Sequence, residues 1–167
     1  MKKQSKRTIK QRRRAGKTDY KARFKLLKSC LPRVIVRKTN RYITAQYVKS
    51  EQAQDFVVIT VSSKELLKYG WKKEQAGSLK SLPAAYLTGL LLGKKIKQMN
   101  KENKAILDIG LHRNVKKSRI YVVLNGLIDS GMEIKHKKEV FPDEKRIKGE
   151  HLKNKIDFEK IKENILK

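Results

Sequence analysis

The stretch RVIVRKTNRYITAQYVKSEQAQDFVVITV, residues 33–61, decides the fold class. Its apolar, β-branched and aromatic runs predict strands at Arg33–Lys38, Tyr42–Val48 and Phe56–Val61. Thr39-Asn40 predicts a short hairpin turn, because asparagine tolerates the left-handed conformation that tight turns require. The polar segment Lys49–Asp55 predicts an exposed loop between the second and third strands. The stretch therefore predicts an antiparallel meander.

Helical patterns and further strand signals follow on the C-terminal side. In the order of the chain, we expect a short helix at Lys64–Tyr69, a loop at Gly70–Leu82, a longer helix from Pro83 to about Asn100, a buried strand at Lys104–Gly110, a helix at Arg119–Gly131, a short strand at Glu133–Lys135 and a helix at Asp157–Leu166. In the longer helix, Ala85, Gly89 and Gly93 are four residues apart on one face. This spacing predicts a close approach of the helix backbone to the sheet.

A helix is also predicted before the meander. Thr18 is a plausible N-cap with Asp19 in the first turn, and apolar side chains recur at spacings of four, three and four from Tyr20 to Leu31. Lysine and arginine occupy most of the other positions, and Pro32 ends the helix. The helix should thus have one apolar side and one cationic side.

The charge of the chain restricts its partners. The 167 residues include 43 Lys+Arg and 16 Asp+Glu, which gives a formal net charge of +27. Self-repulsion on this scale argues against an ordinary metabolic enzyme and favours a polyanionic partner, with nucleic acid ahead of an anionic membrane surface. The longest apolar run, Leu82–Leu92, is far shorter than a membrane span, and the single cysteine, Cys30, cannot form an intramolecular disulfide. We expect a soluble intracellular protein.

The positive charge is concentrated at the N-terminus. Residues 1–50 hold 18 Lys+Arg and one acidic residue, a net charge of +17. The first 17 residues are nearly devoid of large apolar side chains, so we expect a basic arm that is disordered when free and binds phosphates. A solubilising tail or a nuclear-import signal is the alternative. The triplet Arg12, Arg13 and Arg14 favours phosphate binding, because guanidinium groups match phosphate geometry.

The titratable residues do not form a recognisable catalytic or metal-binding pattern. The three histidines are far apart, and there is no GxxxxGK[ST] or GxGxxG loop, so we expect no cofactor and no metal. Asp108, Asp129 and Glu133 offer the only resemblance to a two-metal nuclease. The predicted first strand adds only Arg33, Arg37 and Lys38, so the set lacks ligands. We interpret Asp108 as a structural hydrogen-bond acceptor.

Binding of RNA is the remaining interpretation. Among the aromatic residues, Trp71 is the best candidate for stacking on a base, because it lies in a predicted loop beside Lys72 and Lys73. Most contacts should go to phosphates and to the shape of a folded RNA. A metal-dependent RNA nuclease and a non-specific nucleic-acid packing protein remain the alternatives.

Several segments resemble a known family. They are TDYKARFKLLKS (18–29), PRVIVRKTNRYITAQ (32–46), SSKELLKYGWK (62–72), LPAAYLTGLLLGKK (82–95), AILDIGLH (105–112) and FPDEKRIKGEHL (141–152). They resemble, in the same order, the archaeal form of the L-eighteen family, the 5S-rRNA-binding proteins of the large ribosomal subunit, related to the eukaryotic L-five. PAAYLTGLLLGKK and RIKGEH are the specific strings. The segments 74–81 and 113–117 depart from the family pattern.

The resemblance implies a fold and a place in the cell. It implies an α/β domain with a three-layer architecture around a mixed five-stranded sheet, related to ribonuclease H but without its catalysis. It implies a non-enzymatic protein of the cytoplasmic ribosome, located in the central protuberance. The implied partners are 5S rRNA, the large-subunit rRNA and neighbouring ribosomal proteins, including the second 5S-binding protein, L-five. Together with the charge pattern, it suggests a basic arm (1–17), an α/β RNA-binding domain (18–136) and a polar C-terminal extension (137–167).

The resemblance also implies which positions contact RNA. They are the arm, the start of the first helix, the first hairpin and the loop that follows the short helix. By residue, these are Lys2, Lys3, Lys6, Arg7, Lys10, Arg12, Arg13, Arg14, Lys17, Thr18, Tyr20, Arg23, Arg37, Lys38, Asn40, Arg41, Lys68, Tyr69, Trp71 and Lys72.

Overall fold

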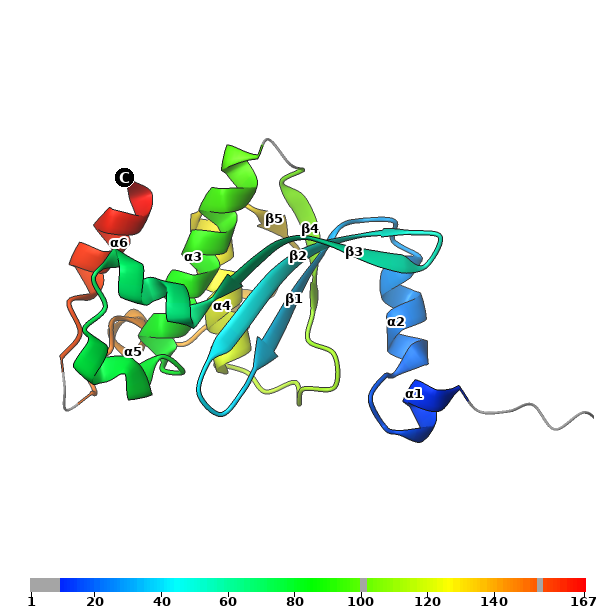
Figure 1. Cartoon of the computed structure of the whole chain (residues 1–167), viewed down its shortest axis with the longest axis horizontal. Helices are drawn as coiled ribbons and strands as arrows, with labels where there is room; N and C mark the ends of the chain where they lie inside the picture. Colours follow the sequence, from blue (N-terminus) through cyan, green and yellow to red (C-terminus); the bar gives the residue numbers. More distant parts are fainter. Residues whose placement is uncertain (1–9, 100–101, 153–154) are drawn as a thin grey trace, which may run out of the picture.

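A five-stranded mixed sheet forms the centre of the computed structural model, which describes residues 10–99, 102–152 and 155–167 (Figure 1). The strand order is β3-β2-β1-β4-β5. The pairs β2/β3 and β1/β2 are antiparallel, whereas β1/β4 and β4/β5 are parallel. The strands are β1 (Arg33–Lys38), β2 (Ile43–Glu51), β3 (Gln54–Ser62), β4 (Lys104–Asp108) and β5 (Glu133–Ile134). The predicted meander and the α/β class are confirmed.

The second hairpin differs from the prediction. Strands β2 and β3 pair as far as Glu51 and Gln54, so only Gln52 and Ala53 form the turn, with φ angles of +47° and +64°. Positive φ at both positions is the geometry of a tight type I′ hairpin. The predicted loop Lys49–Asp55 was wrong, because polar side chains are compatible with a strand whose surface is open to solvent. The first turn spans Thr39–Tyr42 and includes the predicted Thr39-Asn40, but Asn40 does not take the left-handed conformation that we expected of it.

Two helices cover one face of the sheet. Helix α3 (Leu82–Gln98) contacts β2, β3 and helix α4 (Arg119–Asp129), and α4 also contacts β1. The side chains buried beneath these helices come from alternate strand positions such as Val34, Val36, Ala45 and Tyr47. No helix in the described ranges is long and apolar enough to cross a membrane.

The glycines of α3 pack against α4. A Cβ atom at Gly89 would strike the backbone carbonyl of Val123, and one at Gly126 would strike the carbonyl of Tyr86. Gly93 lies equally close to Ser130. The packing role predicted for Gly89 and Gly93 is confirmed, but the partner is α4 rather than the sheet. Neither helix could approach the other so closely with side chains at these positions.

The C-terminal extension belongs to the same hydrophobic core. It contains η3 (Lys138–Val140), α5 (Glu144–Lys148) and α6 (Phe158–Leu166). Ile147, Phe158, Ile161 and Ile165 are buried within the main cluster, and α6 contacts α3 and η1 (Ser63–Tyr69). The C-terminal extension therefore packs against α3 and η1.

The N-terminal helices lie apart from this layer. Figure 1 places α1 (Gln11–Arg14) and α2 (Tyr20–Leu27) at the end of the molecule remote from α3, α5 and α6. Asp19, not Thr18, caps α2: its Oδ1 accepts hydrogen bonds from the backbone N–H groups of Lys21 (2.9 Å) and Ala22 (3.1 Å). The aspartate is one residue closer to these donors, so the Thr18 prediction was wrong. The short helix α1 lies in the segment that we expected to be disordered in the free chain.

Candidate nucleic-acid interface

A cleft of about 900 Å³ lies between the N-terminal segment and the strands β1 and β4. One wall comes from the arm and α2, the other from β1, β4 and the loop after β4. The charged or titratable side chains in its lining are Arg12, Lys17, Asp19, Arg23, Lys25, Arg37, Asp55, Asp108 and His112. The loop after β4 takes part because β4 ends at Asp108 beside Ile35, and the loop then reaches the end of β1, where His112 contacts Lys38.

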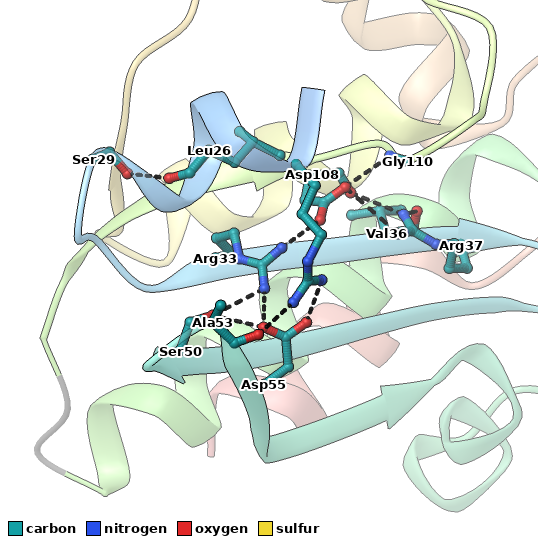
Figure 2. A network of polar contacts seen from close by, with 11 residues as sticks. Leu26, Ser29, Arg33, Val36, Arg37, Ser50, Ala53, Asp55, Asp108 and Gly110 are labelled. Atoms are coloured by element: carbon teal, nitrogen blue, oxygen red, sulfur yellow. Dashed lines mark hydrogen bonds and ion pairs between the residues drawn. The ribbon is translucent and has the colours of Figure 1, made fainter. Parts of the chain in front are cut away.

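A network of ion pairs centred on the buried Arg33 lies next to this cleft (Figure 2). Arg33 is 1% exposed, and its Nη1 donates to Asp108 Oδ2 at 3.0 Å. Its Nη2 donates to Asp55 Oδ1 and, at 2.9 Å, to Ser50 Oγ. The other oxygen of Asp108, Oδ1, accepts from the backbone N–H of Gly110 at 2.8 Å. The interpretation of Asp108 as a structural acceptor is confirmed.

Two further arginines connect the network to the cleft. Arg23 on α2 donates from Nη1 to Asp55 Oδ2 at 2.7 Å and from Nη2 to the carbonyl of Ala53 at 3.0 Å. This pair of bonds attaches α2 to the β2–β3 turn. Arg37 donates to the backbone carbonyl of Asp108 at 3.0 Å, and its Nη2 lies 3.5 Å from Asp108 Oδ1. Both guanidinium groups line the cleft.

Two residues that line the cleft have shifted pKa values. Burial alone would raise the pKa of Asp55, but hydrogen bonds from Arg23, Ser50 and Arg33 outweigh burial and lower it to about 2. Burial, with the nearby charges of Arg37 and Lys38, lowers the pKa of His112. His112 is therefore neutral at pH 7, which agrees with its Nε2 accepting the backbone N–H of Lys38 at 3.2 Å.

Each acidic side chain that lines the cleft has a hydrogen-bond or ion-pair partner, whereas several of the cationic side chains have no carboxylate partner among the described residues. Asp19 caps α2, while Asp55 and Asp108 pair with arginines. Within the described ranges, no carboxylate lies within 4.0 Å of the charged groups of Arg12, Lys17 or Lys25. The Nε of Arg12 donates to Thr18 Oγ1 at 2.9 Å, which orients the guanidinium without neutralising it. The cleft therefore presents uncompensated positive charge to a polyanion.

The structure separates the predicted RNA-contacting residues into groups. Around the cleft lie Arg12, Lys17, Thr18, Arg23 and Arg37. Near it are Tyr20, with Lys10 Nζ 4.8 Å from its ring centroid, and the exposed Arg13 and Arg14 of α1. At the exposed tip of the β1–β2 hairpin lie Lys38, Asn40 and Arg41. The arm residues Lys2, Lys3, Lys6 and Arg7 lie outside the described residues.

The remaining predicted RNA contacts, from Lys68 to Lys72, lie at the other end of the molecule. The prediction for one of them, Trp71, was wrong. Trp71 is 2% exposed, and its Nε1 donates to the carbonyl of Gln75 at 3.1 Å, so its indole fills the core and cannot stack on a base. Gly70, with a φ of +105°, reverses the chain and directs Trp71 inward. The carbonyl of Tyr69 accepts from Asn164 of α6 at 3.0 Å. Lys68 and Lys72 are exposed beside them.

Lys25 and His112 line the cleft but were not among the predicted contacts. Lys25 could have been found from the cationic side of its helix. For His112 the available signal was its position just after a buried parallel strand, since ligands often bind at the carboxyl edge of such strands.

The three carboxylates of the nuclease alternative contact other residues instead of forming a shared site among the described residues. Asp129 accepts a hydrogen bond from the Tyr86 hydroxyl at 2.6 Å, and Glu133 is an exposed residue 3.9 Å from Lys104. Asp108 is held by Arg33. Across the described ranges, no three His, Cys, Asp or Glu side chains are grouped as a metal site would require.

Comparisons with known proteins identify the family. The model of a family described as "Ribosomal large subunit proteins 60S L5, and 50S L18" matches residues 4–105 and 94–137. A large ribosomal subunit protein uL18 of Methanothrix thermoacetophila is 46% identical over 161 residues, which cover 93% of this chain and 92% of the relative. Proteins of the same name from Korarchaeum cryptofilum and Methanococcus maripaludis are 50% and 47% identical, over 84% and 86% of this chain and 70% and 72% of theirs. The chain therefore belongs to the family of large-subunit ribosomal proteins that comprises 60S L5 and 50S L18.

Proposed function

We propose that this protein binds 5S rRNA and attaches it to the large-subunit rRNA in the central protuberance, next to neighbouring ribosomal proteins that include L-five. The family consists of structural proteins of the cytoplasmic ribosome, which are not enzymes. The observation that carries the proposal is the cleft whose acidic residues are all occupied while Arg12, Lys17 and Lys25 remain available.

RNA binding would depend on the two walls of the cleft. The wall formed by β1 and β4 is rigid, and the wall formed by the arm and α2 is positively charged. Strands β1 and β4 are hydrogen-bonded into the sheet, and the Arg33 network fixes the ends of both strands. The arm and α2 have no buried side chains in the described ranges, so they can adjust to an RNA surface. A folded RNA would be recognised by its shape through phosphate contacts, and released counterions would make the affinity strongly dependent on salt.

Competition binding tests the proposal. At moderate salt, we expect the protein to prefer cognate 5S rRNA over tRNA and over random duplex RNA by about ten- to over a hundredfold, or about 1.4–3 kcal/mol. The same titrations at several salt concentrations should show a fall in affinity by orders of magnitude if about 6–10 phosphates are contacted. Equal affinity for all three RNAs would contradict the proposal and favour the non-specific packing protein.

Deletion of the arm, residues 1–17, should separate binding from folding. We expect affinity for 5S rRNA to fall at least tenfold at moderate salt, because the arm carries nine Lys+Arg. The midpoint of thermal unfolding should change by only a few degrees, since none of the described side chains of the arm is buried. Loss of cooperative unfolding in the truncated protein would show that the arm has a structural role.

A further inference from the structure

The motif RIKGEH, residues 146–151, is not part of the cleft described above, and the fold gives it a specific position. Helix α5 ends at Gly149, which has a φ of +82°. A Cβ atom there would lie 2.7 Å from Pro83 Cγ, so glycine allows the end of α5 to pack against the first turn of α3. Ile147 is buried between them in the core cluster. This packing leaves Arg146 and His151 lining a second hollow.

This second hollow has a volume of about 580 Å³ and is strongly basic. Its lysine and arginine side chains come from three separate parts of the chain. They are Lys38 of β1, Arg113, Lys117 and Arg119 around the start of α4, and Arg146 of α5. None of the described residues that line it is acidic. We call it the extension pocket.

The nearest carboxylates do not cancel this charge. Asp143 Oδ1 lies 3.7 Å from Lys117 Nζ, and Glu139 Oε2 lies 3.2 Å from the neighbouring Lys116. Both pairs are largely exposed, and exposed pairs contribute little and are screened by salt. In the described ranges, no carboxylate lies within 4.0 Å of the charged groups of Arg113, Arg119 or Arg146.

The pocket also contains an unsatisfied hydrogen-bonding group. The hydroxyl of Ser118, the N-cap residue of α4, is buried and has no hydrogen-bond partner among the described residues. A buried hydroxyl without a partner is unfavourable unless a ligand or water supplies one. Rotation of the Ser118 side chain into the pocket would let its hydroxyl donate to a phosphate oxygen, next to the positive end of the α4 dipole.

The extension pocket adjoins the cleft. His112 lines both, and Lys38 follows Arg37 on β1, so the two side chains emerge on opposite faces of the strand. Arg37 lines the cleft and Lys38 lines the pocket. The two basic surfaces therefore meet at the carboxyl end of β1, beside the loop after β4.

We propose that the extension pocket binds backbone phosphates of the same RNA that occupies the cleft, which under the proposed function is 5S rRNA. The C-terminal extension thereby contributes directly to RNA binding, through Arg146 and His151. The partner is RNA rather than an acidic protein segment because arginines from separate elements surround one concave basic site, and guanidinium groups match phosphate geometry.

Paired charge-neutralising variants test the proposal. The pocket variant is Arg113→Gln with Arg146→Gln, and the control is Lys64→Gln with Lys160→Gln, which removes two exposed charges outside both basic surfaces. With transcribed 5S rRNA as the probe, we expect the pocket variant to bind at least tenfold more weakly at moderate salt. The slope of log affinity against log salt should decrease by about two. The control should lose less than threefold and keep its slope.

A second test uses cross-linking and does not require a variant with lower affinity for RNA. Val115 is exposed and lines the pocket, so a benzophenone amino acid at this position should cross-link to 5S rRNA in the full-length protein. A pocket variant that behaves like the control, or the absence of a cross-link to bound 5S rRNA, would overturn the proposal. A wild-type protein that does not prefer 5S rRNA over tRNA would instead overturn the proposed function. The salt slope and the cross-link would still test the pocket, because neither measurement depends on that preference.

Discussion

Deletion of residues 157–167, which contain α6, is expected to lower the midpoint of thermal unfolding by about 10–20 °C. Phe158, Ile161 and Ile165 are buried against α3 and η1, and each such side chain contributes about 1.5–3 kcal/mol through burial. The summed loss, roughly 5 kcal/mol or more, is a large part of the stability of a typical domain. Circular dichroism during heating measures the effect.

Two neighbouring residues provide a matched pair of point variants. Ile165 is 0% exposed and Leu166 is 56% exposed, on the same last turn of the same helix. Ile165→Ala should cost about 2–5 kcal/mol in the free energy of unfolding, whereas Leu166→Ala should cost less than about 1 kcal/mol. Equal effects of the two variants, or a deletion that leaves the midpoint unchanged, would mean that the extension is an appendage to a domain that ends near residue 137.

The role of α6 shows what periodicity can predict. The stripe of Phe158, Ile161 and Ile165 identified an apolar face, and the helix was predicted at its observed place. Periodicity does not reveal which surface an apolar face packs against, because the partners in α3 and η1 are distant in sequence. The same limit explains why Gly89 and Gly93 were expected to face the sheet although they face α4.

The sequence predicts the positive charge of the candidate site, but not which of its cationic side chains pair with carboxylates. The basic arm and the cations near it follow directly from composition, and the resemblance indicates RNA. Which cations are neutralised depends on Asp55 and Asp108, which meet only after the sheet has formed. Trp71 illustrates the same point: adjacent lysines suggested an exposed loop, but the conformation of Gly70 buries the indole.

The substitution Arg33→Met is expected to destabilise the protein by about 3–5 kcal/mol at pH 7. The variant removes a guanidinium that bridges Asp55 and Asp108 and leaves Asp108, which is largely buried, with fewer partners. Arg33→Lys should be nearly as harmful, since one ammonium group cannot replace a fork that bonds Asp108 from one nitrogen and Asp55 from the other. Urea denaturation measures both. The control is Glu133→Gln, which alters an exposed pair and should cost less than about 1 kcal/mol.

The same network should make stability depend on pH in the acid range. The pKa of Asp55 falls from an ordinary value of 3.8 to about 2 on folding, so the folded state favours the ionised carboxylate. The resulting stabilisation, about 2 kcal/mol, is fully present above about pH 4 and is lost as the pH falls towards 2. In Asp55→Asn this contribution is absent at every pH, so the variant should be less stable than wild type at pH 7 and approach it near pH 2. Parallel stability curves for the two proteins between pH 5 and 2 would contradict this assignment, because the loss would then come from carboxylates outside the Arg33 network.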